Sequence, residues 1–211
     1  MRFHNRIEAG RLLAKKLEKY QFKDAVVYAL PRGGVEVAVE VARHLVVPLD
    51  LLVPRKIGHP DHPEYAVCAL SEDGYLVCNQ DELEVLDKEW LREAVLREAA
   101  EAERRREMYL KGRPPLPVQG KVAIIVDDGV ATGLTILAAI HDVRRYEPAK
   151  VVLALPVLPI DTLQLLNEEV EEVVALDVPE TFLGAISAYY EEFDQIDDKR
   201  VISLMEKFGS G

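Results

Sequence analysis

The chain has 211 residues, enough for one α/β domain with an appendage or for two small domains. With 49% hydrophobic and 30% charged residues it is globular in composition, which excludes a disordered or fibrous protein. The formal net charge of −11 argues against a protein that binds nucleic acid through the phosphate backbone, because such binding needs clustered lysine and arginine.

The first twenty residues are charged throughout and lack the apolar core of a signal peptide. The longest apolar run, residues 151–160, is too short to span a bilayer. We therefore expect a soluble, cytoplasmic protein with no membrane partner. Cys68 and Cys78 lie in short apolar stretches without a CxxC motif, so we expect buried, reduced thiols and neither a disulfide nor a zinc site.

The predicted elements alternate between strands and helices along the chain. Asn5 is a plausible cap for a first helix that carries Ile7, Leu13 and Leu17 on one face. Apolar runs predict strands at 24–30, 49–53, 121–126, 150–155 and 171–176. Helical periodicity predicts further helices at 35–46, 87–109, 134–146 and 197–208. This alternation implies right-handed βαβ crossovers, so the fold class is α/β, a doubly wound and mostly parallel sheet flanked by helices.

Two further segments complete the expected organisation. A polar loop with proline and glycine covers residues 55–65, and two short apolar runs within 66–78 predict a small β-hairpin insertion. We assign residues 1–160, with this loop and hairpin, to the core. Residues 161–211, with 13 acidic and 3 basic side chains, form an acidic C-terminal strand and a helical cap, or hood, of the same domain.

The stretch IIVDDGVATGLT, residues 124–135, is the most informative part of the chain. An apolar strand ends in Asp127 and Asp128, and small and hydroxyl residues then lead into a helix. In open α/β sheets ligands bind beyond the carboxyl ends of the strands, and a helix N-terminus offers unpaired N–H groups to a phosphate. The carboxylates repel phosphate, so they suit sugar hydroxyls or a hydrated Mg²⁺. The alternative is a helix cap followed by a plain turn.

This stretch resembles the phosphoribosyl pyrophosphate (PRPP) signature of type I phosphoribosyltransferases. The shared features are an apolar strand, two acids, three variable residues, Thr-Gly, one further residue and a Thr or Ser. The order of elements extends the resemblance over about residues 20–160. The resemblance implies a Mg²⁺-dependent glycosyltransferase of nucleotide salvage, which transfers the phosphoribosyl group of PRPP to a small-molecule acceptor and releases pyrophosphate. Dimers are common in this family, so the resemblance also implies a homodimer.

The resemblance assigns roles to individual residues of this stretch. Asp127 and Asp128 would hold the ribose hydroxyls and the Mg²⁺, directly or through water, as the central catalytic pair. The ribose 5-phosphate would lie on a loop of six residues: Val130, Ala131, Thr132, Gly133, Leu134 and Thr135.

Two cationic segments would serve the pyrophosphate. Leu30–Gly34 stands where the family has its pyrophosphate loop, with Arg32, Gly33 and Gly34 as ligands and a non-proline cis peptide at Pro31–Arg32. The two glycines expose N–H groups and Arg32 can fork onto phosphate oxygens, although a simple strand-to-helix turn is the alternative. The loop 55–65 would be a mobile lid whose Arg55 and Lys56 neutralise pyrophosphate charge. We count Arg32 and Lys56 among the catalytic residues.

The acceptor is less well defined by the sequence. Ala131 stands where purine salvage enzymes usually carry an Asp, which weighs against a hypoxanthine or guanine acceptor without establishing uracil. The aromatic side chains Phe182, Tyr189 and Tyr190, with Tyr65 beside the lid, could stack on a planar base, although core packing explains them as well.

Two alternatives concern function as a whole. A catalytically silent regulatory protein that binds PRPP or a nucleotide would keep the same loops. A kinase or phosphatase is disfavoured because the chain has no Walker loop and no Asp-x-Asp arrangement. The run Arg104–Arg106 is flanked by glutamates, so we expect it to form ion pairs on a solvated helix face and not a nucleic-acid site.

Overall fold

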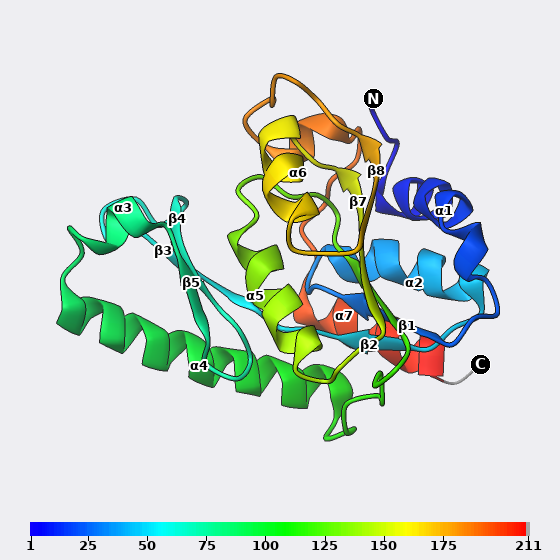
Figure 1. Cartoon of the computed structure of the whole chain (residues 1–211), viewed down its shortest axis with the longest axis horizontal. Helices are drawn as coiled ribbons and strands as arrows, with labels where there is room; N and C mark the ends of the chain where they lie inside the picture. Colours follow the sequence, from blue (N-terminus) through cyan, green and yellow to red (C-terminus); the bar gives the residue numbers. More distant parts are fainter. Residues whose placement is uncertain (210–211) are drawn as a thin grey trace.

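A five-stranded parallel sheet with the order β2-β1-β6-β7-β8 organises the chain, as the computed structural model of residues 1–209 shows (Figure 1). Its strands are β1 (Ala25–Ala29), β2 (Leu49–Leu51), β6 (Val122–Val126), β7 (Lys150–Val157) and β8 (Glu172–Asp177). The predicted α/β fold with a doubly wound parallel sheet is therefore confirmed. Residues 210 and 211 of the predicted C-terminal segment lie outside the described part of the chain.

Helices cover both faces of this sheet, because successive side chains of a strand point to opposite faces. Val27 and Ile124 pack in one buried cluster with α1 (Arg6–Lys16), α2 (Gly34–Leu45) and α7 (Asp198–Gly209). Val26 and Ile125 pack in a second cluster with α5 (Leu134–Arg144) and α6 (Ile160–Asn167). Among residues 1–209, no helix is long and apolar enough to cross a membrane.

A second, antiparallel sheet projects from this core (Figure 1). It consists of β3 (Arg55–Gly58), β4 (Ala66–Leu70) and β5 (Leu76–Cys78), followed by the short α3 (Gln80–Leu83) and the long α4 (Lys88–Leu110). The hairpin predicted within 66–78 is confirmed as β4 and β5. The segment 55–65 was expected to be a loop throughout, but its first four residues form β3, which pairs with β4 from Arg55↔Leu70 onwards. This strand forms because Ile57 joins a local apolar cluster with Val67 and Trp90.

The two cysteines form a disulfide, so the prediction of reduced thiols was wrong. The register of β4 and β5 places Cys68 directly opposite Cys78, and their Cα atoms are 4.0 Å apart. The sequence indicated the hairpin, but it did not specify the register that brings the two sulfur atoms together.

The C-terminal segment contributes to both the core and a cover over it. β8 extends the parallel sheet next to β7, so the acidic strand of this segment is part of the core. Residues 178–197, with the 3₁₀ helix η2 (Ile186–Tyr189), then cover the N-terminal part of the chain, where Phe3 pairs with Tyr190 in an isolated bridge. Sequence periodicity missed α6, whose eight residues directly follow Pro159.

Candidate active site

The candidate site lies where the loops after β1 and β6 meet. These strands are neighbours in the sheet, but the chain continues from β1 to β2 on one side and from β6 to β7 on the other. Such a switch point leaves a crevice at the carboxyl ends of the strands, where α/β proteins bind ligands. The N–H of Leu30 donates to the carbonyl of Val126 at 3.0 Å and ties the two strand ends together.

The loop after β1 rests directly on the two carboxylates. A Cβ atom added at Gly33 would lie 2.0 Å from Oδ2 of Asp128, and one added at Gly34 would lie 2.7 Å from Oδ1 of Asp127. No other residue type fits here without displacing the acids. The predicted cis peptide at Pro31–Arg32 is present. The structure thus brings together the glycines and the acids that the sequence placed about one hundred residues apart.

Asp128 forms an ion pair that the sequence did not predict. Its Oδ2 accepts a hydrogen bond from Nε of Arg6 at 2.7 Å, and the two side chains are only 15% and 7% exposed. The Arg6 guanidinium also donates to the carbonyl of Asp194 and lies 3.7 Å from the centre of the Phe193 ring. A signal for this role was present, because Arg6 falls on the same helical face as the buried Gly10 and Leu13.

Burial and mutual repulsion dominate the electrostatics of the two acids. Burial raises the pKa of Asp127 well above its ordinary value, and the negative charge of Asp128 raises it further. Burial also raises the pKa of Asp128, while Arg6 opposes this shift. Oδ1 of Asp127 accepts a hydrogen bond from the N–H of Asp128 at 2.8 Å. The pair is therefore a site where a cation or hydroxyl donors from a ligand would relieve unfavourable charge.

The C-terminal segment clamps the turn that follows the acids. The hydroxyl of Tyr190 donates to the carbonyl of Asp128 at 2.6 Å. Gly129 has a φ of +151° and packs against Ile186. A Cβ atom added at Gly129 would lie 2.6 Å from Cγ2 of Ile186. Residues 186–190 thus fix the backbone beside the acids.

The loop from Val130 to Thr135 ends in an open helix N-terminus. Gly133, with a φ of +84°, precedes α5, and no side chain caps that helix. The first turn of α5 contains no acidic residue, so its unpaired N–H groups and its dipole favour an anion. The carbonyl of Ala131 accepts a hydrogen bond from Thr162 at 2.6 Å, while Ala131 and Thr132 face solvent. This geometry suits a phosphate group.

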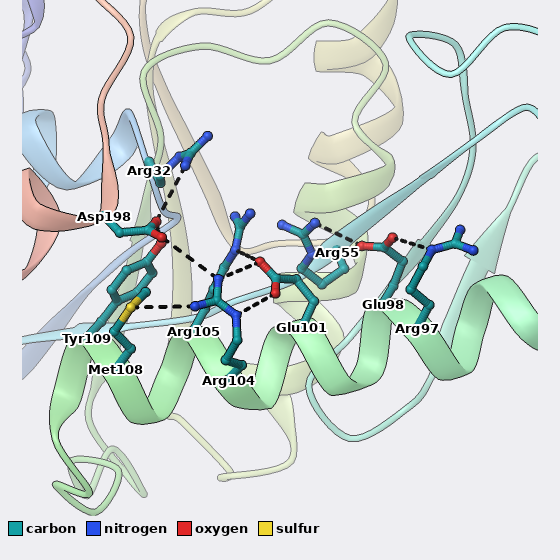
Figure 2. Close-up of polar contacts among 10 residues, drawn as sticks. All are labelled: Arg32, Arg55, Arg97, Glu98, Glu101, Arg104, Arg105, Met108, Tyr109 and Asp198. Carbon is teal, nitrogen blue, oxygen red and sulfur yellow. Dashed lines mark hydrogen bonds and ion pairs between the residues drawn. The ribbon is translucent and has the colours of Figure 1, made fainter.

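The predicted pyrophosphate-side cations are all ion-paired, and Figure 2 shows the pairs of Arg32 and Arg55. Nη1 of Arg32 lies 3.4 Å from Oδ1 of Asp198, at the start of α7. Nε and Nη2 of Arg55 donate to Oε2 of Glu98 in α4, at 3.1 and 2.8 Å. Nζ of Lys56 lies 3.6 Å from the carboxylate of the exposed Glu64. Arg32 and Arg55 follow the neighbouring strands β1 and β2, so both belong to the same edge of the sheet.

The aromatic residues proposed for an acceptor pocket do not gather into one. Tyr189 and Tyr190 are buried in a cluster with Phe3, and the ring of Phe182 stacks on Tyr189 at 5.9 Å. Tyr65 lies in the turn directly before β4, where its hydroxyl donates to Glu82. A cavity of about 310 Å³ does lie beside the loop after β1. Its lining includes Arg6, Arg32, Gly33, Phe193, Gln195 and Ile196.

The two acids fit a magnesium ion only in part. Within residues 1–209, no group of three or more His, Cys, Asp or Glu side chains could hold a metal ion by itself. Mg²⁺ is commonly held by one or two carboxylates together with waters and substrate phosphates. Asp127 and Asp128 therefore fit an ion that is shared with a phosphorylated ligand.

The arginine run in α4 is less solvated than expected. Arg104 and Arg105 both donate to Glu101, as predicted for a helical pair. Arg106 instead points inward, where its Nη1 donates to the carbonyl of Leu51 at 3.0 Å and to Glu72 at 3.1 Å. The expectation of a solvated face was wrong for Arg105 and Arg106, whose side chains are only 15% and 22% exposed, because α4 crosses the end of β2 here.

Comparison with known proteins agrees with this geometry. The family model of the phosphoribosyl transferase domain matches residues 4–191. Two curated proteins of Mycobacterium tuberculosis, from strains CDC 1551 and H37Rv, are named provisionally as phosphoribosyl transferases. Each is 41% identical to this chain over 207 residues. These matches cover 97% of this chain and 46% of each relative, so the chain spans about half the length of the curated relatives it matches.

A solved structure shows the same architecture over the whole chain. The crystal structure of TT1426 from Thermus thermophilus has a TM-score of 0.81 and 39% sequence identity, and the match covers 99% of both chains. The match to the family model and these relatives confirm the resemblance that the sequence carried. The chain belongs to the phosphoribosyl transferase family.

Proposed function

We propose that this protein transfers the 5-phosphoribosyl group of PRPP to a small-molecule acceptor and releases pyrophosphate. The observation that carries this proposal is the contact of Gly33 and Gly34 with Asp128 and Asp127 at the switch point of the sheet. The loop after β1 suits a pyrophosphate, and the loop Val130–Thr135 suits the phosphate of a phosphorylated sugar. The two acids lie between these loops.

Each part of the site then has a role in the transfer. The loop Val130–Thr135 and the open N-terminus of α5 bind the ribose 5-phosphate. Asp127 and Asp128 accept hydrogen bonds from the ribose hydroxyls. Arg32, Gly33 and Gly34 bind the pyrophosphate, with Arg55 and Lys56 supplying further positive charge. These contacts hold the anomeric carbon in place for the incoming acceptor.

The reaction exchanges one bond at the anomeric carbon for another. The acceptor donates an electron pair to this carbon, and the bond to the pyrophosphate oxygen breaks with its electron pair leaving on pyrophosphate. Asp127 and Asp128 would hold a Mg²⁺, directly or through water, and the ion would neutralise part of the pyrophosphate charge. The arginines stabilise the same charge as it develops.

We expect the acceptor to resemble a nucleobase. It would not make the contact with an Asp that purine salvage enzymes usually provide at the position of Ala131. Ala131 offers no carboxylate to a purine ring, and the lining of the cavity beside Arg32 includes Phe193 and Gln195. Such a lining suits a planar ring with polar edges.

A binding protein without transfer activity is the second candidate. The ion pairs of Arg32 with Asp198 and of Arg55 with Glu98 favour it, because they neutralise the cations that a leaving pyrophosphate would need. Release of pyrophosphate from PRPP with a panel of nucleobases separates the two. Transfer predicts release with at least one base, whereas PRPP binding without release from any base would favour the regulatory alternative.

A further inference from the structure

Helix α4 runs along the edge of the sheet that carries the pyrophosphate loop. Near its C-terminal end, the hydroxyl of Tyr109 donates to Oδ1 of Asp198 at 2.6 Å, and the same oxygen pairs with Arg32. One turn earlier, Arg106 donates to the carbonyl of Leu51, the last residue of β2. α4 therefore passes both the loop after β1 and the end of β2, the two places from which Arg32 and Arg55 extend.

Arg105 directly precedes Arg106 on this helix and lies one turn before Tyr109. Its Nε donates to Oε1 of Glu101 at 2.6 Å, and the side chain is only 15% exposed. Figure 2 shows its guanidinium raised from the helix toward the side on which the guanidinium groups of Arg32 and Arg55 lie. Within residues 1–209, no protein acceptor bonds to the two terminal nitrogens of Arg105. Those nitrogens are donors that a ligand can use.

The acid that holds Arg105 is fixed as an anion. Hydrogen bonds from Arg104, and then from Arg105, lower the pKa of Glu101 to about 2. At neutral pH Glu101 is therefore charged and orients Arg105 through Nε. The two terminal nitrogens of the guanidinium remain available to a ligand.

The neighbouring Arg104 differs because its donors are already engaged. It donates to both oxygens of Glu101 through Nε and Nη2, and its Nη1 lies against the sulfur of Met108. Its Nη2 also lies 3.8 Å from Oδ2 of Asp198, and its side chain is 51% exposed (Figure 2). Two adjacent arginines thus share one acid, but only Arg105 keeps both terminal nitrogens for a ligand.

We propose that Arg105 is a third pyrophosphate-binding arginine, which α4 supplies beside Arg32 and Arg55. This inference rests on the proposed function, because it assigns a ligand to the same site. Pyrophosphate carries several negative charges, and the acids Asp198 and Glu98 already offset Arg32 and Arg55. Glu101 offsets Arg105 in the same way, but only through Nε, so the two unused terminal nitrogens of this third guanidinium add charge-assisted hydrogen bonds to the pyrophosphate.

The test is a calorimetric titration with inorganic pyrophosphate and, separately, with ribose 5-phosphate, at fixed ionic strength and Mg²⁺ concentration. The variants are Arg105→Gln and Arg105→Lys, with Arg104→Gln as the matched control. We expect Arg105→Gln to weaken pyrophosphate binding by about tenfold or more, the loss typical of one charged hydrogen bond. Arg105→Lys should bind with intermediate affinity, since it keeps the charge but loses the fork.

Ribose 5-phosphate affinity should stay at the wild-type value in all variants, which also shows that they fold. Equal pyrophosphate affinity for wild type and Arg105→Gln would overturn the inference, as would equal losses in Arg104→Gln and Arg105→Gln. Wild-type protein that binds pyrophosphate through Arg105 but never transfers from PRPP would refute the proposed reaction and leave this site in place.

Discussion

Arg6 and Asp128 show how one buried ion pair can support a whole site. The acid lies beside a second acid under a glycine loop, and both are shielded from water. Arg6, in the first turn of α1, supplies a positive charge that compensates these acids. The ring of Phe193 packs against its guanidinium. The ion pair links the first helix to the motif of residues 124–135.

We predict that Arg6→Gln lowers the free energy of unfolding by about 3 kcal/mol, because it leaves a buried carboxylate without its partner. Urea unfolding at pH 7 measures this change. Arg11→Gln is the matched control, since Arg11 lies on the same helix and pairs with Glu40 but is 68% exposed. That exposed pair should contribute no more than about 0.5 kcal/mol. Similar losses in the two variants would contradict the role given to Arg6.

At this scale the sequence predicted the acids but not their partners. Asp127, Asp128 and the glycine loop follow from local patterns, because a strand end and a helix start are both visible in the sequence. Arg6 and Asp198 are far from the motifs along the chain, and only the fold brings them to the site. Their roles depend on packing between distant elements, which no local pattern encodes.

Among the elements, the junction between the second sheet and α5 carries a titratable group. The turn between β4 and β5 places the N–H of Glu72 2.8 Å from Oδ2 of Asp142, and Asp73 forms an ion pair with Arg145 at 3.0 Å. The ring of Tyr75 stacks on His141 with centroids 3.7 Å apart. Burial raises the pKa of Asp142 to about 7. The docking of the second sheet thus depends on the protonation of this carboxyl.

We predict that this junction makes the protein less stable as the pH rises. The pKa of Asp142 is higher in the folded chain than in the unfolded chain, where it is near 3.8. The folded state therefore binds the Asp142 proton more tightly than the unfolded state does. The stability that this proton contributes is lost as the pH rises from about 4 to 7. Between pH 5 and pH 7 the loss should be on the order of 2 kcal/mol.

Chemical unfolding of wild type and Asp142→Asn at both pH values measures this effect. The variant keeps an acceptor oxygen for Glu72 and should lose less stability over the same range. Asp73→Asn is the control: despite some burial, hydrogen bonds from Ser71 and Tyr75 lower the pKa of Asp73, so this variant should keep the wild-type decline. Parallel pH profiles for wild type and Asp142→Asn would refute the assignment.

The disulfide in the second sheet leads to a separate prediction. Cys68 and Cys78 are the two cysteines of the chain, so unfolded, unreduced protein should contain no reactive thiol and reduced protein should contain two. A thiol assay in denaturant measures this directly. Closing a loop of this length should stabilise the fold by about 2–3 kcal/mol, which a Cys68→Ser/Cys78→Ser variant would lose. Two reactive thiols before reduction would contradict the pairing.

Element by element, segments with a clear apolar or helical pattern were predictable, whereas β3 and α6 were not. The parallel strands and α4 stand out because each has an unbroken apolar or helical pattern. β3 has the sequence RKIG, with a single large apolar residue, and α6 directly follows a proline at the end of an apolar run, so neither stands out as a separate element. The strand pairing that joins Cys68 to Cys78 depends on register, which an apolar run alone does not specify.

For the molecule as a whole, the acidic charge no longer conflicts with an anionic ligand. Many acids of the C-terminal segment pair with bases from earlier in the chain: Glu172 binds Lys19 and Lys150, and Glu171 binds Arg144. The arginines near the loop after β1 are paired as well: Arg32 with Asp198, Arg55 with Glu98 and Arg105 with Glu101. The acidic excess is therefore partly neutralised by ion pairs, and the site has arginines of its own.

The proposed function requires that Asp128 and the loop that follows it bind PRPP. Isothermal titration of PRPP with Mg²⁺ into wild type, Asp128→Asn and Asp24→Asn tests it most directly. Asp24 lies just before β1, at the opposite end of the sheet, and its side chain is 78% exposed. We expect wild type and Asp24→Asn to bind PRPP alike and Asp128→Asn to bind it at least about tenfold more weakly. Equal affinity for wild type and Asp128→Asn, or no binding by the wild type, would contradict it.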